Sequence, residues 1–296
     1  MRRILFFSFM VLWATLSKAQ EKPLAKVHYI FKHVNDTTQR DKHVRDEVVT
    51  YLGEKDSYYT SYSATRMQED VKTQIEDPVF DGQLVIINRT TAIKESYIIK
   101  PTEQQLIEIA RVASDEFILS GVYPEQEWEI FEESQEVGGY NCQKATTKFK
   151  GRNYTAWFTT DIPFSAGPWK LHGLPGLILS AKDDKGEVEF TYAGFDKLEA
   201  ETTIRIAPSA KAIPSTAVEV EKLEKAFRAN PSAYMDSRSG RSNMISVGSN
   251  GVAVGRAAKG GSNPAMDVSK IKSMSVKNDD SYKPSKTTNN PIELTP

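Results

Sequence analysis

The chain has 296 residues, of which 39% are hydrophobic and 26% are charged, and its formal net charge at pH 7 is −1. Such a balance is typical of a globular protein with one sizeable core, and it excludes the strong basic field that attracts nucleic acid. The single cysteine, Cys142, excludes an intramolecular disulfide framework, so an apolar core must stabilise the fold.

The first residues have the pattern of a secretory signal peptide. Arg2 and Arg3 precede an apolar run over residues 4–16, and small residues follow up to Ala19. The run is too short for a comfortable membrane span, and no later segment approaches about 18 consecutive apolar residues. We therefore expect residues 1–19 to be removed on export, leaving a chain that starts at Gln20 and has no transmembrane segment.

From residue 25 onward most segments alternate apolar and polar side chains, as half-buried β-strands do. The expected strands, in chain order, are residues 25–32, 48–52, 58–62, 83–88, 97–100, 117–123 and 127–133. Two hairpins follow, formed by residues 140–149 with 154–159 and by residues 177–181 with 188–192, and residues 202–207 can pair next. Sequential short strands of this kind favour a meandering antiparallel sheet over alternating βαβ units.

Three segments have a helical pattern. Apolar residues recur at four-residue spacing over residues 67–75. A second helix is predicted over residues 102–113, which open with a capping-box pattern completed by Gln105. The third, over residues 216–230, has the same pattern with Glu219.

Residues 236–296 differ in composition from the rest. Ser, Gly, Asn and Lys dominate, and apolar residues occur singly without helical or strand periodicity. Such a segment cannot bury enough apolar surface to offset its ordering entropy. We therefore expect a β-rich domain at residues 20–235 followed by a disordered tail at residues 236–296.

The stretch GPWKLHGLPGLILSAKD, residues 167–183, concentrates proline and glycine around an apolar run. Pro168 and Pro175 disfavour a helix because each fixes φ and restricts the residue before it. Pro175 and Gly176 suit the central positions of a type II turn, in which Gly176 needs a positive φ. Residues 177–179 then start a strand whose continuous apolarity predicts burial on both faces.

Two interpretations of this stretch remain open. It is a corner that closes the core, because proline and glycine usually serve geometry, or it is the wall of an apolar ligand site. Aromatic residues are in surplus, among them Tyr58, Tyr59 and Tyr62 in one hairpin. The candidate ligand or partner surface consists of Trp157, Trp169, Leu171, His172, Leu174 and Pro175.

Residues 173–178 read GLPGLI, and related motifs occur at residues 139–140, 142–145, 151–152, 156–158, 162–163 and 167–170. With these motifs the chain closely resembles the GLPGLI family over about residues 24–207. The resemblance implies an exported protein of Bacteroidota, often encoded beside a TonB-dependent outer-membrane receptor and located in the periplasm or at the outer membrane, with no established biochemical activity. By analogy with periplasmic lipoprotein carriers, the expected fold is mainly β (α+β), a curved antiparallel sheet or half-barrel with a few helices on its concave side.

No motif points to catalysis, a cofactor or a metal. HExxH, GxSxG, P-loop and GxGxxG patterns are all missing from the sequence. Cys142 with His172 is a conceivable nucleophile and base, yet a lone cysteine on an alternating strand is more often a small buried hydrophobe. Asp183 and Asp184 are expected to form a turn, and the acidic run at residues 125–136 a solvated strand face.

Two hypotheses for function follow, and neither is enzymatic. The first is an exported envelope protein that binds an apolar ligand, a lipid or a peptide cargo in the concavity of a half-barrel. The second is an accessory partner of an outer-membrane receptor that has a filled core and binds through exposed strand edges. A cavity of roughly several hundred Å³ favours the first, and a packed interior with a long unpaired edge favours the second.

Overall fold

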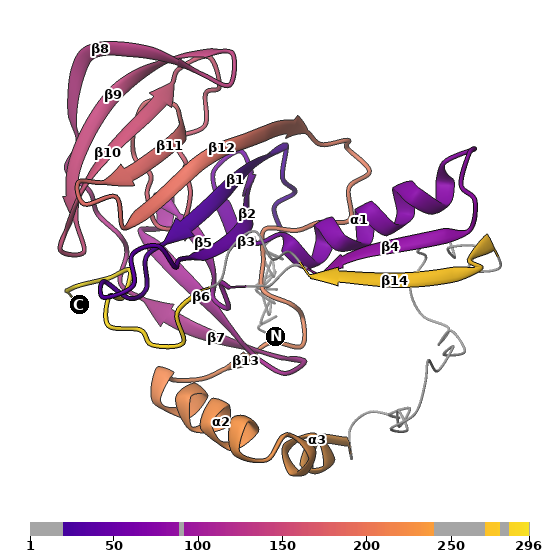
Figure 1. Ribbon diagram of the computed structural model, residues 1–296. Coiled ribbons are helices and arrows are strands. Elements are labelled where there is room, and N and C mark those ends of the chain that lie inside the picture. The colour runs from indigo at the N-terminus through magenta and orange to yellow at the C-terminus, as the bar shows by residue number, and fades with distance from the viewer. Residues whose placement is uncertain (1–19, 89–91, 240–269, 279–283, 296) are drawn as a thin grey trace, which may run out of the picture.

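The computed structural model describes residues 20–88, 92–239, 270–278 and 284–295 (Figure 1). The expected signal peptide and much of the expected tail lie outside the described residues. Within the described residues, no helix is long and apolar enough to span a membrane.

A single 12-stranded sheet forms most of the fold. In spatial order its strands are β13 (Ile213–Pro214), β7 (Asp115–Gly121), β6 (Gln105–Val112), β5 (Ser96–Lys100), β3 (Ser57–Ser61), β2 (Val44–Leu52), β1 (Ala25–His33), β12 (Val188–Lys197), β11 (Leu177–Asp183), β10 (Arg152–Thr159), β9 (Tyr140–Phe149) and β8 (Glu129–Val137). Neighbouring strands are antiparallel except β13 and β7. The sheet does not close into a barrel, because β13 and β8 are its two edges.

Two antiparallel meanders make up this sheet. One runs from β1 through β2, β3, β5 and β6 to β7, and the other runs from β8 to β12. The pairing of β1 with β12, which sets Phe31 opposite Phe190, joins the two meanders. The expected fold class, a mainly β protein with a curved antiparallel sheet and a few helices, is therefore confirmed.

Both meanders contribute to one apolar core. Tyr97 and Leu106 of the first meander belong to the same buried cluster as Tyr154 and Phe190 of the second. A flat sheet cannot bring such distant strands to a common core, so the sheet bends around it (Figure 1). Residues 160–176, which connect β10 to β11, lie inside this bend and supply Trp169 to the cluster.

The start of β11 is buried on both faces, as predicted. Leu177, Ile178 and Leu179 are each 0% exposed, because the connecting loop covers the face that the rest of the sheet does not. The backbone N–H of Ile178 donates to the carbonyl of Ala166 at 3.0 Å, so the loop also pairs with the strand that follows it.

The turn before β11 differs from the predicted type II turn. The N–H of Gly176 donates to the carbonyl of Leu174 at 2.8 Å, which closes a three-residue turn around Pro175. Positive φ occurs at Gly173 and not at Gly176. Gly176 is required for a different reason, because a Cβ there would lie 2.1 Å from the carbonyl oxygen of Thr159.

In the part of the chain that the structure describes, three α-helices lie outside the sheet. They are α1 (Ser63–Glu76), α2 (Ala217–Ala229) and α3 (Pro231–Ser239). The capping box of α2 is present as predicted, with Thr216 and Glu219 each accepting a backbone N–H of the other. On the core side of the sheet, α2 packs its Val220 in a cluster with Ala110 and Phe117. The strand β4 (Gln83–Asn88) contacts α1 and lies outside the large sheet.

Two expected elements are wrong. The segment predicted to be a helix from Thr102 is a 3₁₀ turn, Pro101–Glu103, followed by β6. The apolar residues of this segment fit both the helical and the strand period. Pairing with β5 on one side and β7 on the other decides for a strand and overrides the capping signal. Residues 202–207 form no strand, although Ile206 makes an isolated bridge with Glu21.

The described pieces of the expected tail differ from a structureless segment. Residues Ser273–Asn278 form β14, which pairs in parallel with β4. Residues 284–295 pack against the domain, where the Asn290 amide donates to the carbonyl of Val34 at 2.7 Å. The folded unit therefore extends beyond residue 235.

Gly176→Ala should lower the free energy of unfolding by about 3 kcal/mol, because the new Cβ meets fixed backbone. Urea unfolding followed by tryptophan fluorescence measures this loss. Gly139→Ala is the matched control, since a Cβ at Gly139 meets nothing within 4 Å and only its positive φ opposes the change, at about 1 kcal/mol. Equal losses in the two variants would contradict the role assigned to Gly176.

His33 should make stability depend on pH. Burial lowers its pKa from 6.5 to about 4, with a further contribution from the positive charge of Arg152. The unfolded chain binds a proton at His33 more readily than the folded chain does. The contribution of His33 to the free energy of unfolding is therefore highest above pH 6.5 and decreases as the pH falls toward 4. Between pH 7 and pH 4, urea unfolding should show that the wild-type chain loses about 3 kcal/mol more stability than His33→Gln; an identical pH profile in both proteins would rule this out.

Candidate functional site

The central residues of the candidate surface lie in the core. Trp169, Leu171 and Leu174 are 3%, 0% and 1% exposed. The indole of Trp169 packs edge-on against Phe149, with ring centroids 5.5 Å apart. These positions agree with the interpretation of the stretch as a corner that closes the core, and a role for the three side chains in binding stays a prediction.

His172 lies where the same loop reaches the surface. Its Nε2 is 2.8 Å from the carbonyl oxygen of Pro124, and burial lowers its pKa. The Trp128 indole donates to the His172 carbonyl at 2.8 Å, so both the side chain and the backbone of His172 are held by hydrogen bonds. His172 lines a surface hollow with Tyr123, but this hollow excludes Trp157 and Trp169.

The remaining candidates point elsewhere. Trp157 is half-buried on the face of β10 opposite Tyr154 and Phe158, and it lines a separate hollow against β11 and β12. Pro175 is exposed at the turn. The structure therefore brings Trp169, Leu171 and Leu174 together and separates Trp157 from them.

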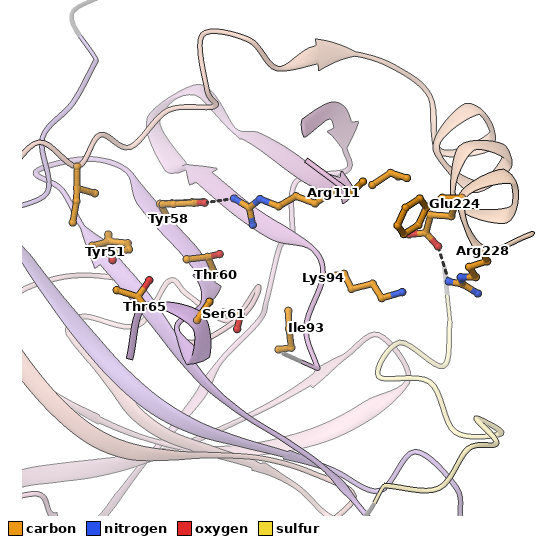
Figure 2. A pocket seen from close by; sticks show the side chains of 15 residues that line it. Tyr51, Tyr58, Thr60, Ser61, Thr65, Ile93, Lys94, Arg111, Glu224 and Arg228 are labelled. Atoms are coloured by element: carbon orange, nitrogen blue, oxygen red, sulfur yellow. Dashed lines mark hydrogen bonds and ion pairs between the residues drawn. The ribbon is translucent and has the colours of Figure 1, made fainter. Parts of the chain in front are cut away.

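A cavity of 720 Å³ lies on the face of the sheet opposite the main core (Figure 2). Its walls come from β2, β3, the first turn of α1, the segment before β5, the end of β6 and the C-terminal half of α2. Its lining residues are Tyr51, Tyr58, Thr60, Ser61, Ala64, Thr65, Ile93, Lys94, Arg111, Val112, Ala113, Ile204, Glu224, Phe227 and Arg228. Strand alternation explains the choice of face, because Tyr59, between two of these residues, belongs to the core.

Two tyrosines and an arginine form the inner wall. The rings of Tyr51 and Tyr58 stack with centroids 6.0 Å apart and an interplanar angle of 17°. Burial raises the pKa of Tyr51 to about 12, so its hydroxyl stays protonated. Arg111 donates to the Tyr58 hydroxyl at 3.2 Å and to Ser96 at 3.1 Å, while Glu116 pairs with the same guanidinium at 2.9 Å. The wall thus combines flat apolar surface with fixed polar groups.

Charged side chains stand at the opening. Figure 2 shows Lys94 reaching from one wall toward Glu224 and Arg228 on α2, which are joined by an ion pair of 2.7 Å. Lys94 is exposed. Among the described lining residues, Lys94, Arg111 and Arg228 outnumber the single carboxylate, so the rim favours an uncharged or weakly anionic ligand.

Asp46 supports the wall from behind. Its carboxylate is 3% exposed and accepts the hydroxyls of Ser61 and Ser63 and the backbone N–H groups of Ala92 and Ile93, at 2.6–3.0 Å. One carboxylate thereby links β2 and β3 to the start of α1 and to the segment that carries Lys94. Burial raises the pKa of Asp46 even though these hydrogen bonds favour its charged form.

The arrangement suits binding. Stacked rings, hydroxyl groups and a guanidinium are what concave ligand sites use to orient a partly apolar molecule. The sequence showed a cluster of tyrosines around Tyr58 but did not predict the site. Arg111 lies in β6, which was expected to be a helix. Cys142, the conceivable nucleophile, is buried at 0% exposure in the main core, and burial raises its thiol pKa to about 11.

A family model described as N-glycanase peptide, N-terminal domain, matches residues 57–227. The chain belongs to this family. The matched residues begin in β3 and end in α2, so they include Tyr58, Arg111 and Phe227 of the cavity. The match is to a single N-terminal domain and not to a whole enzyme.

Solved structures of PNGF-II in the P21 and C2 space groups align with 69% of this chain at 16% sequence identity, with TM-scores of 0.44 and 0.45. The chain spans about a third of the length of those proteins, 33% and 32% respectively. No curated protein matches the chain.

Asp46→Asn should lower the free energy of unfolding by about 2–3 kcal/mol, because an amide nitrogen replaces an oxygen that accepts buried N–H groups. Urea unfolding at pH 7 measures the loss. Asp184→Asn is the control, since Asp184 is exposed in a turn, and its cost should stay below about 0.5 kcal/mol. A loss at Asp46 no larger than the control would contradict the supporting role.

Proposed function

We propose that this protein is a non-enzymatic binding protein and that its ligand occupies the cavity on the outer face of the sheet, where residues from the C-terminal half of α2 line one end. The observation that carries the proposal is the stacked pair of Tyr51 and Tyr58 beside Arg111 in a cavity of 720 Å³. The ligand has a flat apolar face that stacks on the tyrosines and acceptor groups that meet Arg111 and Lys94.

The position of the site departs from the expected concavity. The inside of the bend is packed with the loop that carries Trp169, Leu171 and Leu174, whereas the cavity on the other face is open to solvent. A lipid or peptide cargo that binds this protein therefore binds outside the core. The family description names an N-glycanase, so an oligosaccharide or glycopeptide is the first ligand class to test.

The location we propose is the bacterial cell envelope, in the periplasm or at the outer membrane. Two sequence features support it: the secretory pattern of residues 1–19 and the resemblance to the exported GLPGLI family. The protein used in the experiment below is therefore the chain from Gln20 onward, purified from a periplasm.

Native mass spectrometry of that protein, followed by organic extraction, should reveal a bound lipid, peptide or saccharide. Tyr58→Ala should lower its occupancy about tenfold, because truncating an aromatic anchor costs about 2 kcal/mol or more. Trp157→Ala is the matched control, since it removes a half-buried aromatic side chain from a different hollow and should leave occupancy unchanged. The reverse pattern would move the ligand to the candidate surface around Trp157 and contradict the cavity.

An empty protein, also after incubation with membrane extract, would favour the second candidate function, an accessory partner of an outer-membrane receptor. The specific observation behind it is β8, an edge strand whose residues are almost all exposed and which pairs only with β9. Such an edge can accept a strand from another protein. Its glutamates, which lie on both faces of the strand, would favour a basic partner strand.

A further inference from the structure

The C-terminal segment, defined here as residues 284–295, lies across several turns of the domain (Figure 1). Its Asn289 and Asn290 N–H groups donate to the carbonyl of Asn35, in the turn after β1. Farther along, the N–H of Leu294 donates to the carbonyl of Lys150, in the β9–β10 hairpin. The segment joins no sheet in the described structure, so side chains dominate its attachment.

A buried arginine is the main recognition group. The side chain of Arg152 is 1% exposed, and its Nη1 lies 2.8 Å from Asp183 and 3.0 Å from Glu187. Both carboxylates belong to the β11–β12 hairpin, so the domain itself fixes the guanidinium. Nε and Nη2 then donate to the C-terminal segment: Nε to the carbonyl of Ile292 at 2.8 Å, and Nη2 to Asn290 Oδ1 and the carbonyl of Pro291, both at 2.7 Å.

Both the oxygen and the nitrogen of the Asn290 side-chain amide form hydrogen bonds with the domain. Besides accepting from Arg152, its Nδ2 donates to the carbonyl of Val34 at 2.7 Å and to Glu187 at 3.0 Å. At 5% exposure it is the buried residue of the segment. A side chain that must donate and accept at once selects asparagine over an acid or an aliphatic residue.

Two lysines receive the one carboxylate of the segment. Glu293 pairs with Lys170, which belongs to the GPWKL motif, and its other oxygen is 3.5 Å from Lys150. The Lys170 ammonium also lies 4.7 Å above the ring of Tyr97, so it is held in place independently of the segment. Between these polar anchors, Ile292 packs against the main core.

These groups form a groove with the chemistry of a peptide site. The domain positions Arg152, Glu187 and Lys170. Each of them contacts an extended Asn-Pro-Ile-Glu sequence through a hydrogen bond or an ion pair. Apart from Asn290, the described residues of the segment are exposed or half-buried, so little core would be lost on its departure. Pro291 restricts the unbound segment and reduces the entropy cost of binding.

We propose that this groove is a peptide-recognition site for an extended Asn-Pro-apolar-Glu sequence, that the C-terminal segment is its ligand bound in cis, and that the same segment of a second copy of this chain exchanges with it. Each copy carries both the groove and the sequence that fits it. Exchange of identical segments between two copies then produces a symmetric dimer.

The test uses the full chain from Gln20 with Asn290→Ala and Glu293→Ala combined, which removes from the groove the two side chains that bind in it and leaves the groove residues unchanged. A fluorescein-labelled peptide of residues 284–295 should bind this variant at least about tenfold more tightly than the wild-type chain, whose own segment competes at high effective concentration. Fluorescence anisotropy measures both affinities. Wild-type chain mixed with the variant should form a one-to-one complex in sedimentation velocity.

Peptide variants define the specificity. Glu293→Ala in the peptide should weaken binding about tenfold, since it removes a charge-assisted contact, whereas Lys286→Ala, at an exposed position, should not. A chain carrying Lys170→Glu in addition should reject the native peptide and recover binding with the Glu293→Lys peptide. Recovery of this kind separates recognition from non-specific adhesion.

Three outcomes would overturn the proposal or one part of it. One is a folded double variant that binds no peptide, or binds the peptide that lacks Asn290 and Glu293 equally well. Another is loss of cooperative unfolding in the double variant, and also in a chain with Glu293→Ala alone, which would make the segment an obligatory part of the fold. Peptide binding without a complex between copies would overturn the assignment to a second copy.

Discussion

Burial of residues 160–176 inside the bend of the sheet is the constraint on which the other features depend. The loop brings Trp169, Leu171 and Leu174 to the core, and its backbone is satisfied by the sheet around it: Thr50 donates to the carbonyl of Gly167 at 2.9 Å, and Ile178 pairs with Ala166. A sheet that is filled by its own loop needs no second sheet to cover it. Its opposite face is therefore left for α1, the segment around Ile204 and the cavity.

Local pattern predicted most of the strands, both central hairpins and two of the three helices, because each rests on side-chain period or capping chemistry within a few residues. The helix predicted over β6 was wrong because the apolar spacing there fits both the helical and the strand period. Only pairing with the flanking strands β5 and β7 decides between the two. Gly176 shows the same limit on a smaller scale. Pattern indicated that glycine is needed there, but the reason is a contact with Thr159, which lies in another strand.

Binding groups were harder to predict than the fold. The cavity joins Tyr51, Tyr58, Arg111 and Phe227, which are dispersed over four elements, and no spacing in the sequence relates them. The same holds for Arg152, whose two carboxylates and asparagine partner come from the β11–β12 turn and from the far end of the chain. The composition around Asn290 even argued against its contact with Arg152, since these residues are polar and aperiodic. Their order comes from specific hydrogen bonds and not from apolar burial.

The joining of β1 to β12 also has a kinetic side. β1 finds β2 at once along the chain, but its other edge stays unpaired until residues 188–197 have been made and the whole second meander has formed. Contacts between such distant residues close slowly because a long loop must first be ordered. During that interval β1 presents an open edge that carries Val27, Tyr29 and Phe31, a surface on which a growing chain can mispair with its neighbours. Pairing of β12 with β1 therefore removes the last open edge between the two meanders and covers the strand on which mispairing can occur.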